Sequence, residues 1–301
     1  MAWQEPAAPP RLDSNQVQVW LAPCRIDAGS MRRLESYLSP DEWRRADRFA
    51  LDPPRRAFIV ARGLLRTMLG THLHQSPATI ALSHGSNGKP VLPRSGLEFN
   101  VSHSENLVLI ALAWSRRVGV DIERLQEPAP LGVAERFFAH GERELMRWGP
   151  PSARASAFFT CWTRKEAYLK AIGEGLSAPL ASFSVSAGPD CLAGLRGAAD
   201  ADVVSRWSVH GLPAIPGYAA ALAVEGFRYA LRCLRWPVAA VPSAAVPEGR
   251  PEPPDGRVVQ DAAPAPQGGR DEPQSLQGTV VLDARVDLDR TERRGKLREA
   301  R

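Results

Sequence analysis

Four apolar or alternating segments follow one another between residues 78 and 123, and short links join most of them. They are ATIALSHGSNGKPVL (78–92), LEFNVSHS (97–104), LVLIALAW (107–114) and VGVDIE (118–123). A parallel crossover needs about a dozen residues or more, so links of about three residues predict antiparallel neighbours at 104–106 and 115–117. Asn87 and Gly88 predict a tight hairpin turn within the first segment. This block favours antiparallel sheet over a parallel α/β arrangement.

Helical patterns lie on both sides of this strand-rich block. Ser39, Pro40 and Glu42 have the spacing of a capped helix start. Apolar residues at helical spacing predict helices over 55–69, 133–138, 141–148 and 152–172, and alternation predicts strands over 17–22, 183–187, 206–212 and 218–225. The order of helices, strands, helices and strands predicts an α+β fold of two similar halves, each with an antiparallel sheet, packed pseudo-symmetrically.

The composition divides the chain into four parts. Residues 1–14 are Pro-rich and polar and are expected to be a flexible N-terminus. Residues 15–125 and 126–236 are expected to be the two α+β halves. Between 237 and 278 the chain has nine of its 27 prolines and no aromatic residue, which predicts that 237–301 is a disordered tail.

The charge distribution indicates a phosphorylated or acidic partner. Residues 1–236 carry 28 Lys and Arg against 22 Asp and Glu, whereas 237–301 carry 10 against 11. A basic folded part suits nucleic acid, a phosphorylated small molecule or an acidic protein. No apolar run is long enough to span a membrane and no secretory signal is evident, so we expect a soluble cytoplasmic protein. The four cysteines form no CxxC pair, which argues against a zinc site.

Asp121 and Glu123 are the first candidates for chemistry. They stand two residues apart in a predicted strand, so both carboxylates project from one face while Val120 and Ile122 point to the other. Two adjacent carboxylates repel each other unless protons or a cation neutralise them, and Mg²⁺ is commonly bound by such a pair together with substrate phosphates. The alternative is an ordinary acidic strand end in solvent.

Two further groups have a functional and a structural interpretation. Glu166 and Lys170 share a helical face at i and i+4, as catalytic partners or as an exposed pair that stabilises the helix. Ser102 and His103 lie at a strand end where they could contact a phosphate, or where they could shape a turn. Only four lysines occur in the chain, and Lys89, Lys165 and Lys170 are the three outside the tail.

Four motifs in this order resemble those of the 4′-phosphopantetheinyl transferases. They are Gly88-Lys89-Pro90, Phe99-Asn100-Val101-Ser102-His103-Ser104, Gly119-Val120-Asp121-Ile122-Glu123 and Trp162-Thr163-Arg164-Lys165-Glu166-Ala167-Tyr168-Leu169-Lys170. The similarity is to the larger, surfactin-synthetase type, in which one chain contains two similar halves. It extends from about residue 39 to 186 and more faintly to about 225.

The resemblance implies an enzyme that transfers the phosphopantetheine arm of coenzyme A to a serine of an acyl or peptidyl carrier protein and releases adenosine 3′,5′-bisphosphate. It implies that Asp121, Glu123 and Glu166 hold Mg²⁺ together with the coenzyme A pyrophosphate. It further implies that Glu166 is the base and that Lys170 steadies the pyrophosphate. Metal and cations around phosphates are the equipment that phosphoryl transfer needs.

The resemblance also implies a coenzyme A site in the first half and the metal ligand and catalytic helix in the second. Its residues would be Arg45, Lys89, Ser102, His103, Asp121 and Lys170. Glu42 stands where some relatives carry another cation, and Arg44, Arg55, Arg56 or Arg62 could compensate for it. We expect a monomer, because the two halves supply the whole site.

The basic folded part suits an acidic protein partner, and two other functions are possible for the chain. Carrier proteins are typically acidic and would be attracted by the basic folded part; the segment 136–148 could form part of the docking surface or could be an ordinary amphipathic helix. A family member that binds coenzyme A or a carrier without catalysis is one alternative, which the presence of all three carboxylates and Lys170 disfavours. A nucleic-acid-binding module is another, which the dispersed arginines and the lack of a binding motif disfavour.

Overall fold

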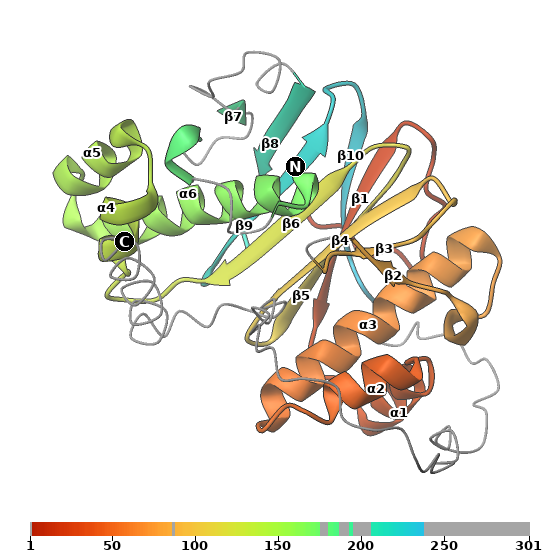
Figure 1. The fold of residues 1–301 in the computed structure, drawn as a ribbon. Helices are drawn as coiled ribbons and strands as arrows, with labels where there is room; N and C mark the ends of the chain where they lie inside the picture. The colour runs from red at the N-terminus through yellow and green to blue at the C-terminus, as the bar shows by residue number, and fades with distance from the viewer. Residues whose placement is uncertain (1, 86–87, 175–179, 187–192, 195–205, 238–301) are drawn as a thin grey trace, which may run out of the picture.

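The structure is a computed structural model that describes residues 2–85, 88–174, 180–186, 193–194 and 206–237. Within these residues the chain forms two four-stranded sheets with helices on their outer sides, which confirms the α+β prediction. Figure 1 shows helices α1–α3 gathered at one end of the molecule and α4–α6 at the other, with the strands between them. The predicted disorder of 237–301 concerns a segment that, apart from Pro237, lies outside the described residues.

The first sheet has the strand order β10-β1-β5-β4. Its strands are β1 (Gln16–Pro23), β4 (Leu97–Ser104), β5 (Leu107–Trp114) and β10 (Ala230–Arg235). β1, β5 and β4 are antiparallel neighbours, whereas β10 pairs with β1 in parallel, so this sheet is mixed. The helices that pack on its outer face are α1 (Ala28–Ser36), α2 (Pro40–Ala46) and α3 (Asp52–Leu73).

The second sheet has the order β6-β9-β8-β7 and is antiparallel throughout. Its strands are β6 (Val118–Arg124), β7 (Ala193–Gly194), β8 (Trp207–Gly211) and β9 (Tyr218–Glu225). Helices α4 (Leu131–Phe137), α5 (His140–Trp148) and α6 (Pro151–Ile172) cover its outer face. The small pair β2 (Ser83–His84) and β3 (Pro90–Val91) and the 3-10 turns Pro77–Thr79 and Leu180–Ser182 complete the described elements.

Three apolar layers hold these parts together. One lies between the first sheet and α1–α3, the second between the second sheet and α4–α6, and the third between the two sheets. Strand alternation sorts the residues among the layers: Val120 and Ile122 of β6 enter the layer between the sheets, and Asp121 lies on the opposite face of the strand. The predicted separation of apolar and acidic faces in this strand is confirmed.

Local signals explain where several helices begin and end. Ser39 caps α2 by accepting from the Glu42 backbone N–H, and the Glu42 carboxylate accepts from the Ser39 N–H, so the predicted capping box is confirmed. α6 ends at Gly173, whose φ of 80° lies in the left-handed region that favours glycine. The predicted hairpin is present as the antiparallel pair β2–β3, although Asn87 lies outside the described residues.

Two predictions of local structure were wrong. β6 does not pair with β5, because β1 and β4 already occupy both edges of β5; the link 115–117 instead carries the chain to the second sheet. The described residues 183–186 form no extended strand. Ser184 forms a single β-bridge, and side chains bond to the backbone on both sides of it: Lys165 donates to the Phe183 carbonyl, and Glu142 accepts from the Val185 N–H.

Candidate active site

The site is formed where helix α6 crosses strand β6. Gly119 allows the close approach, because a Cβ atom at this position would lie 2.5 Å from the Ala171 nitrogen and still closer to the Ala167 carbonyl oxygen. The absence of a side chain lets the backbone of β6 lie directly against the last turns of α6. This contact brings Glu166 and Lys170 of the helix to the acidic face of the strand.

Lys170 bonds to groups from two other elements. Its Nζ lies 2.6 Å from Asp121 Oδ1 on β6 and 3.0 Å from Ser102 Oγ on β4. Burial disfavours the charge on Lys170, but Asp121 and then Glu166 outweigh this and raise the pKa of the ammonium group. The i,i+4 spacing with Glu166 therefore serves a tertiary cluster that joins β4, β6 and α6.

Two carboxylate oxygens in this cluster are buried and have no hydrogen-bond partner among the described residues. They are Asp121 Oδ2 and Glu166 Oε1. A buried carboxylate oxygen without a partner is costly, and a cation at this point would remove the cost. Buried carboxylate oxygens without a partner have the donor chemistry that a hard divalent cation takes as a ligand.

The raised pKa values of two acidic residues also indicate that the cluster lacks positive charge. Burial and then repulsion from Asp121 raise the pKa of Glu123 to about 8. Burial raises the pKa of Glu166 to about 7, although Lys170 opposes the shift. Both carboxyl groups would ionise more readily beside a cation.

The ligand set is open rather than closed. Within the described part of the chain, no group of three His, Cys, Asp or Glu side chains already forms a metal-binding cluster. Mg²⁺ usually keeps several waters and is bound by one or two carboxylates plus substrate phosphates, so a closed protein cage is not required. An arrangement of this kind leaves room for oxygens of a phosphorylated substrate.

Cationic and imidazole groups flank the carboxylates. Burial and then the charges of Lys170 and Arg45 lower the pKa of His103 to about 4, which makes its ring neutral at pH 7. The Arg45 guanidinium lies over the Phe58 ring, 5.4 Å from its centroid, at the end of α2. The structure therefore brings His103, Arg45 and Lys170 into one electrostatic environment beside the carboxylates.

Lys89 and Ser102 have well-defined partners. Lys89 Nζ donates to the Ala171 carbonyl at 3.3 Å and the Val118 carbonyl at 3.5 Å, and burial lowers its pKa to about 8. Lys89 thus contacts the end of α6 at Ala171, the residue that follows Lys170 in the chain. The Ser102 hydroxyl donates to Asp121 Oδ1 at 2.9 Å, so this serine is part of the carboxylate cluster.

Glu42 is engaged inside the protein. Its carboxylate accepts from Arg66 Nε at 2.7 Å and lies 3.8 Å from Arg62 Nε, in addition to capping α2. Arg66 is buried and also donates to the Pro77 and Ile80 carbonyls. The sequence did not single out Arg66, because a buried arginine carries no local signal in an arginine-rich chain.

Lys165, one of the scarce lysines, lies in a separate network. It is fully buried, and its Nζ lies 3.0 Å from Glu142 Oε2 and donates to the Leu180 and Phe183 carbonyls. Its neighbour Glu166 points instead to the carboxylate cluster. Lys165 therefore fastens α5 and the segment after α6 to the helix and does not enter the candidate site.

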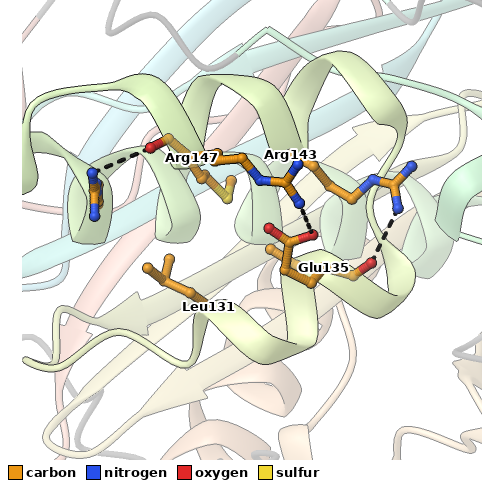
Figure 2. A pocket seen from close by; sticks show the side chains of 7 residues that line it. Leu131, Glu135, Arg143 and Arg147 are labelled. Carbon is orange, nitrogen blue, oxygen red and sulfur yellow. Dashed lines mark hydrogen bonds and ion pairs between the residues drawn. The ribbon is translucent and has the colours of Figure 1, made fainter.

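A pocket of about 210 Å³ lies between α4, α5 and the start of α6. Figure 2 shows Arg143 and Arg147 reaching toward Glu135, and Leu131 lining the same hollow. Arg147 donates to the Glu135 carboxylate at 3.0 Å and Arg143 to the Glu135 carbonyl at 3.2 Å. None of the sequence-predicted site residues lines this pocket.

No helix in the described parts of the chain combines the length and the apolar character that crossing a membrane requires.

The site and the fold define a class of protein before any relative is considered. Two α+β halves meet at a cluster of carboxylates bordered by cations, which is the equipment of an enzyme that handles phosphates with a divalent metal ion. Comparison with known proteins makes the class specific. A sequence model of the 4'-phosphopantetheinyl transferase superfamily matches residues 117–223, and one of the N-terminal part of 4'-phosphopantetheinyl transferases matches 27–115.

Individual relatives agree with these matches. The 4'-phosphopantetheinyl transferase HetI of Nostoc sp. is 38% identical over 226 residues, which cover 73% of this chain and 92% of the relative. The 4'-phosphopantetheinyl transferase Sfp of Bacillus subtilis is 31% identical over 51% of this chain and 68% of its own. The chain therefore belongs to the 4'-phosphopantetheinyl transferase family and is a transferase, as the four motifs predicted.

Proposed function

We propose that this protein transfers the 4′-phosphopantetheine moiety of coenzyme A to a serine of an apo acyl or peptidyl carrier protein, in a Mg²⁺-dependent reaction. The serine oxygen would form a new bond to the β-phosphorus of the coenzyme A pyrophosphate. The bond from that phosphorus to the bridging oxygen would break, and adenosine 3′,5′-bisphosphate would leave. The observation that carries the proposal is the convergence of three acidic side chains and Lys170 at the crossing of β6 and α6.

The chain's own residues would divide the work. Asp121, Glu123 and Glu166 would hold Mg²⁺, which when bound neutralises charge on the pyrophosphate oxygens. Glu166 would accept the serine proton, directly or through water, because a cation beside it would keep its carboxyl group ionised. Lys170 would hold the pyrophosphate and the departing bisphosphate.

The remaining candidate residues would bind coenzyme A. Arg45, His103 and Ser102 lie on the side of the cluster formed by α2 and β4 and would contact its phosphates, with Lys89 near the nucleotide. Neutral His103 would act as a hydrogen-bond donor to phosphate. The Glu42 carboxylate is engaged with Arg66 and the α2 N-terminus, and its charge also acts on Arg45, so Glu42 would take the place of a phosphate contact without adding one.

The chain would divide into two halves at residues 15–125 and 126–236, except that one strand of each range joins the sheet of the other half. β6 belongs to the second sheet and β10 to the first. Because β4, β6 and α6 of a single chain all contribute to the cluster, one copy supplies every proposed site residue, which favours a monomer. Dependence on coenzyme A and buried free cysteines fit a cytoplasmic protein.

The docking surface for an acidic carrier would include the outer side of α5. Leu145 is 55% exposed and Trp148 is 77% exposed, and the same helix carries Arg143 and Arg147, which line the α4–α6 pocket. Exposed apolar side chains on a helix that also carries arginines suit a partner with an apolar patch and acidic surroundings.

The test is transfer itself. The purified protein is incubated with coenzyme A, Mg²⁺ and a panel of apo carrier proteins, and intact mass spectrometry is used to look for the phosphopantetheine adduct. We expect an adduct that requires metal and disappears with Glu166→Ala. Binding of coenzyme A without an adduct on any carrier would favour the non-catalytic alternative, and the absence of both would refute the proposed function.

A further inference from the structure

Strands β4 and β6 meet without forming a sheet. Each is the edge strand of its own sheet, so alternate backbone groups of β6 point away from β9 and have no strand partner. Side chains of β4 satisfy them instead. The N–H groups of Val120, Ile122 and Arg124 donate to side-chain oxygens of Asn100, Ser102 and Ser104, at 2.9, 3.4 and 3.0 Å.

This contact has a constant register. Each of the three bonds joins residues 20 positions apart, and both strands advance by two residues from one bond to the next. We call the three β4 side chains, Asn100, Ser102 and Ser104, the polar seam. All three are buried, so the seam is a fixed part of the structure.

The two serines of the polar seam make a second bond that the asparagine does not. Ser102 Oγ donates to Asp121 Oδ1 at 2.9 Å, and Ser104 Oγ donates to Glu123 Oε2 at 3.2 Å. A hydroxyl group has one proton and two lone pairs. Because the backbone N–H of β6 occupies a lone pair, the proton of each serine is free to point to the carboxylate beside it.

We propose that Ser102 and Ser104 are positioning residues, which hold the Asp121 and Glu123 carboxylates in the orientation needed to bind metal. The inference rests on the proposed function, because it concerns the same carboxylates. One oxygen of each carboxylate is fixed by a serine, and for Asp121 the other oxygen, Oδ2, is the one without a partner among the described residues. Hydrogen-bond partners of metal-binding carboxylates typically contribute about 10- to 100-fold to metal affinity.

Ser104 is the better of the two for a test, because Ser102 also accepts from Lys170 and is a candidate contact for coenzyme A. The variants Ser104→Val and Ser104→Thr have nearly the same shape and differ by one hydroxyl. Asn100→Ala is the matched control, because it removes a seam acceptor that has no bond to either carboxylate.

The measurement is the binding of Mn²⁺, followed by the loss of the free-ion electron paramagnetic resonance signal, with coenzyme A present. We expect Ser104→Val to weaken binding by about ten-fold or more and Ser104→Thr to stay within about three-fold of the unchanged protein. Asn100→Ala should lower the thermal unfolding temperature, because it leaves the Val120 N–H without its acceptor, and should leave the Mn²⁺ affinity nearly unchanged.

Three results would overturn the inference: unchanged binding in Ser104→Val, equal weakening in Ser104→Val and Ser104→Thr, or a loss in Asn100→Ala as large as that in Ser104→Val. If Ser104→Val does not fold, Ser104→Ala, which adds no volume, takes its place under the same criteria. Failure of the unchanged protein to bind Mn²⁺ would count against the proposed function itself, which separates the two proposals.

Discussion

The two longest helices in the described part of the chain, α3 and α6, each have 22 residues and each cover one four-stranded sheet, yet they differ in how completely their buried charged groups are paired. In α3 the buried guanidinium of Arg66 is matched by Glu42 and two carbonyls. In α6 Lys165 is matched in the same manner, but one turn of the helix also carries Glu166, whose Oε1 is buried without a partner among the described residues.

This comparison separates scaffold from site. A buried charge whose hydrogen bonds are all made within the protein stabilises the particular packing around it. A buried oxygen left without a partner is a cost that persists where something outside the chain supplies the missing bond. By this criterion Arg66 of α3 and Lys165 of α6 are structural residues, and Glu166 is a candidate functional residue.

The largest effect is expected at Glu166. Glu166→Gln keeps the shape but removes the base and a negative charge, so we expect transfer to fall by about 10²- to 10⁴-fold in kcat. The unfolding temperature should stay the same or rise, because a neutral amide costs less to bury than a carboxylate. Kinetics with a carrier protein and thermal unfolding check both parts; a large loss of stability would make Glu166 a structural residue like Lys165.

The corresponding change in α3 should affect stability and leave chemistry alone. Arg66→Met removes the nearest cation from the partly buried Glu42 and leaves it only Arg62 at 3.8 Å, so we expect a loss at the lower end of the range for a broken buried ion pair, about 3 kcal/mol in the free energy of unfolding. The double variant Glu42→Gln with Arg66→Met should regain part of this loss, because Gln keeps the capping box without a charge. Urea titration measures the stabilities. If folded Arg66→Met, assayed at low temperature, has a reduced kcat, Arg66 would not be a purely structural residue and the contrast with Glu166 would fail.

The contact between α6 and β6 gives an intermediate effect. Gly119→Ala introduces a methyl group against the helix backbone, so we expect a loss of about 1–3 kcal/mol in stability. Because the shift of the helix moves Glu166 and Lys170 relative to Asp121, kcat should fall as well. Gly132→Ala is the control, since its Cβ would meet nothing within 4 Å. Equal behaviour of the two variants would show that the close approach does not matter.

The smallest effect is expected at the surface of α5. Trp148→Ala should raise the KM for the carrier protein by roughly five-fold, about 1 kcal/mol, and leave kcat and stability nearly unchanged. Leu51→Ala is a matched control, because Leu51 is also largely exposed and lies at the start of α3. An unchanged KM in Trp148→Ala, or an equal change in both, would remove α5 from the docking surface.

Most of the secondary structure could be predicted, because it depends on local signals. β4, β5 and β6 alternate or are strongly apolar, α2 has a complete capping box, and α6 ends at a glycine. β10 and α1 were missed. β10 pairs in parallel with β1, more than 200 positions earlier in the chain, and no pattern within Ala230–Arg235 encodes that partner.

The candidate site shows the same limit. Local spacing left Asp121 and Glu123 as either metal ligands or a solvated strand end, and Glu166 with Lys170 as either catalytic partners or a surface pair. Only the family resemblance joined them in advance. Their proximity depends on the crossing of β6 and α6, which follows from a glycine contact and three apolar layers rather than from any one segment.

The return of β10 to the first sheet has a consequence for how the protein comes apart. The backbone of Gln4 exchanges hydrogen bonds with Cys233 and Arg235, so the beginning of the chain and the last described strand are laced together. The outer strands of the first sheet are β4 and β10, and the whole second sheet lies between them in the sequence. Unfolding of either half would therefore disrupt the other. Heating should give a single cooperative transition with calorimetric and van't Hoff enthalpies that agree.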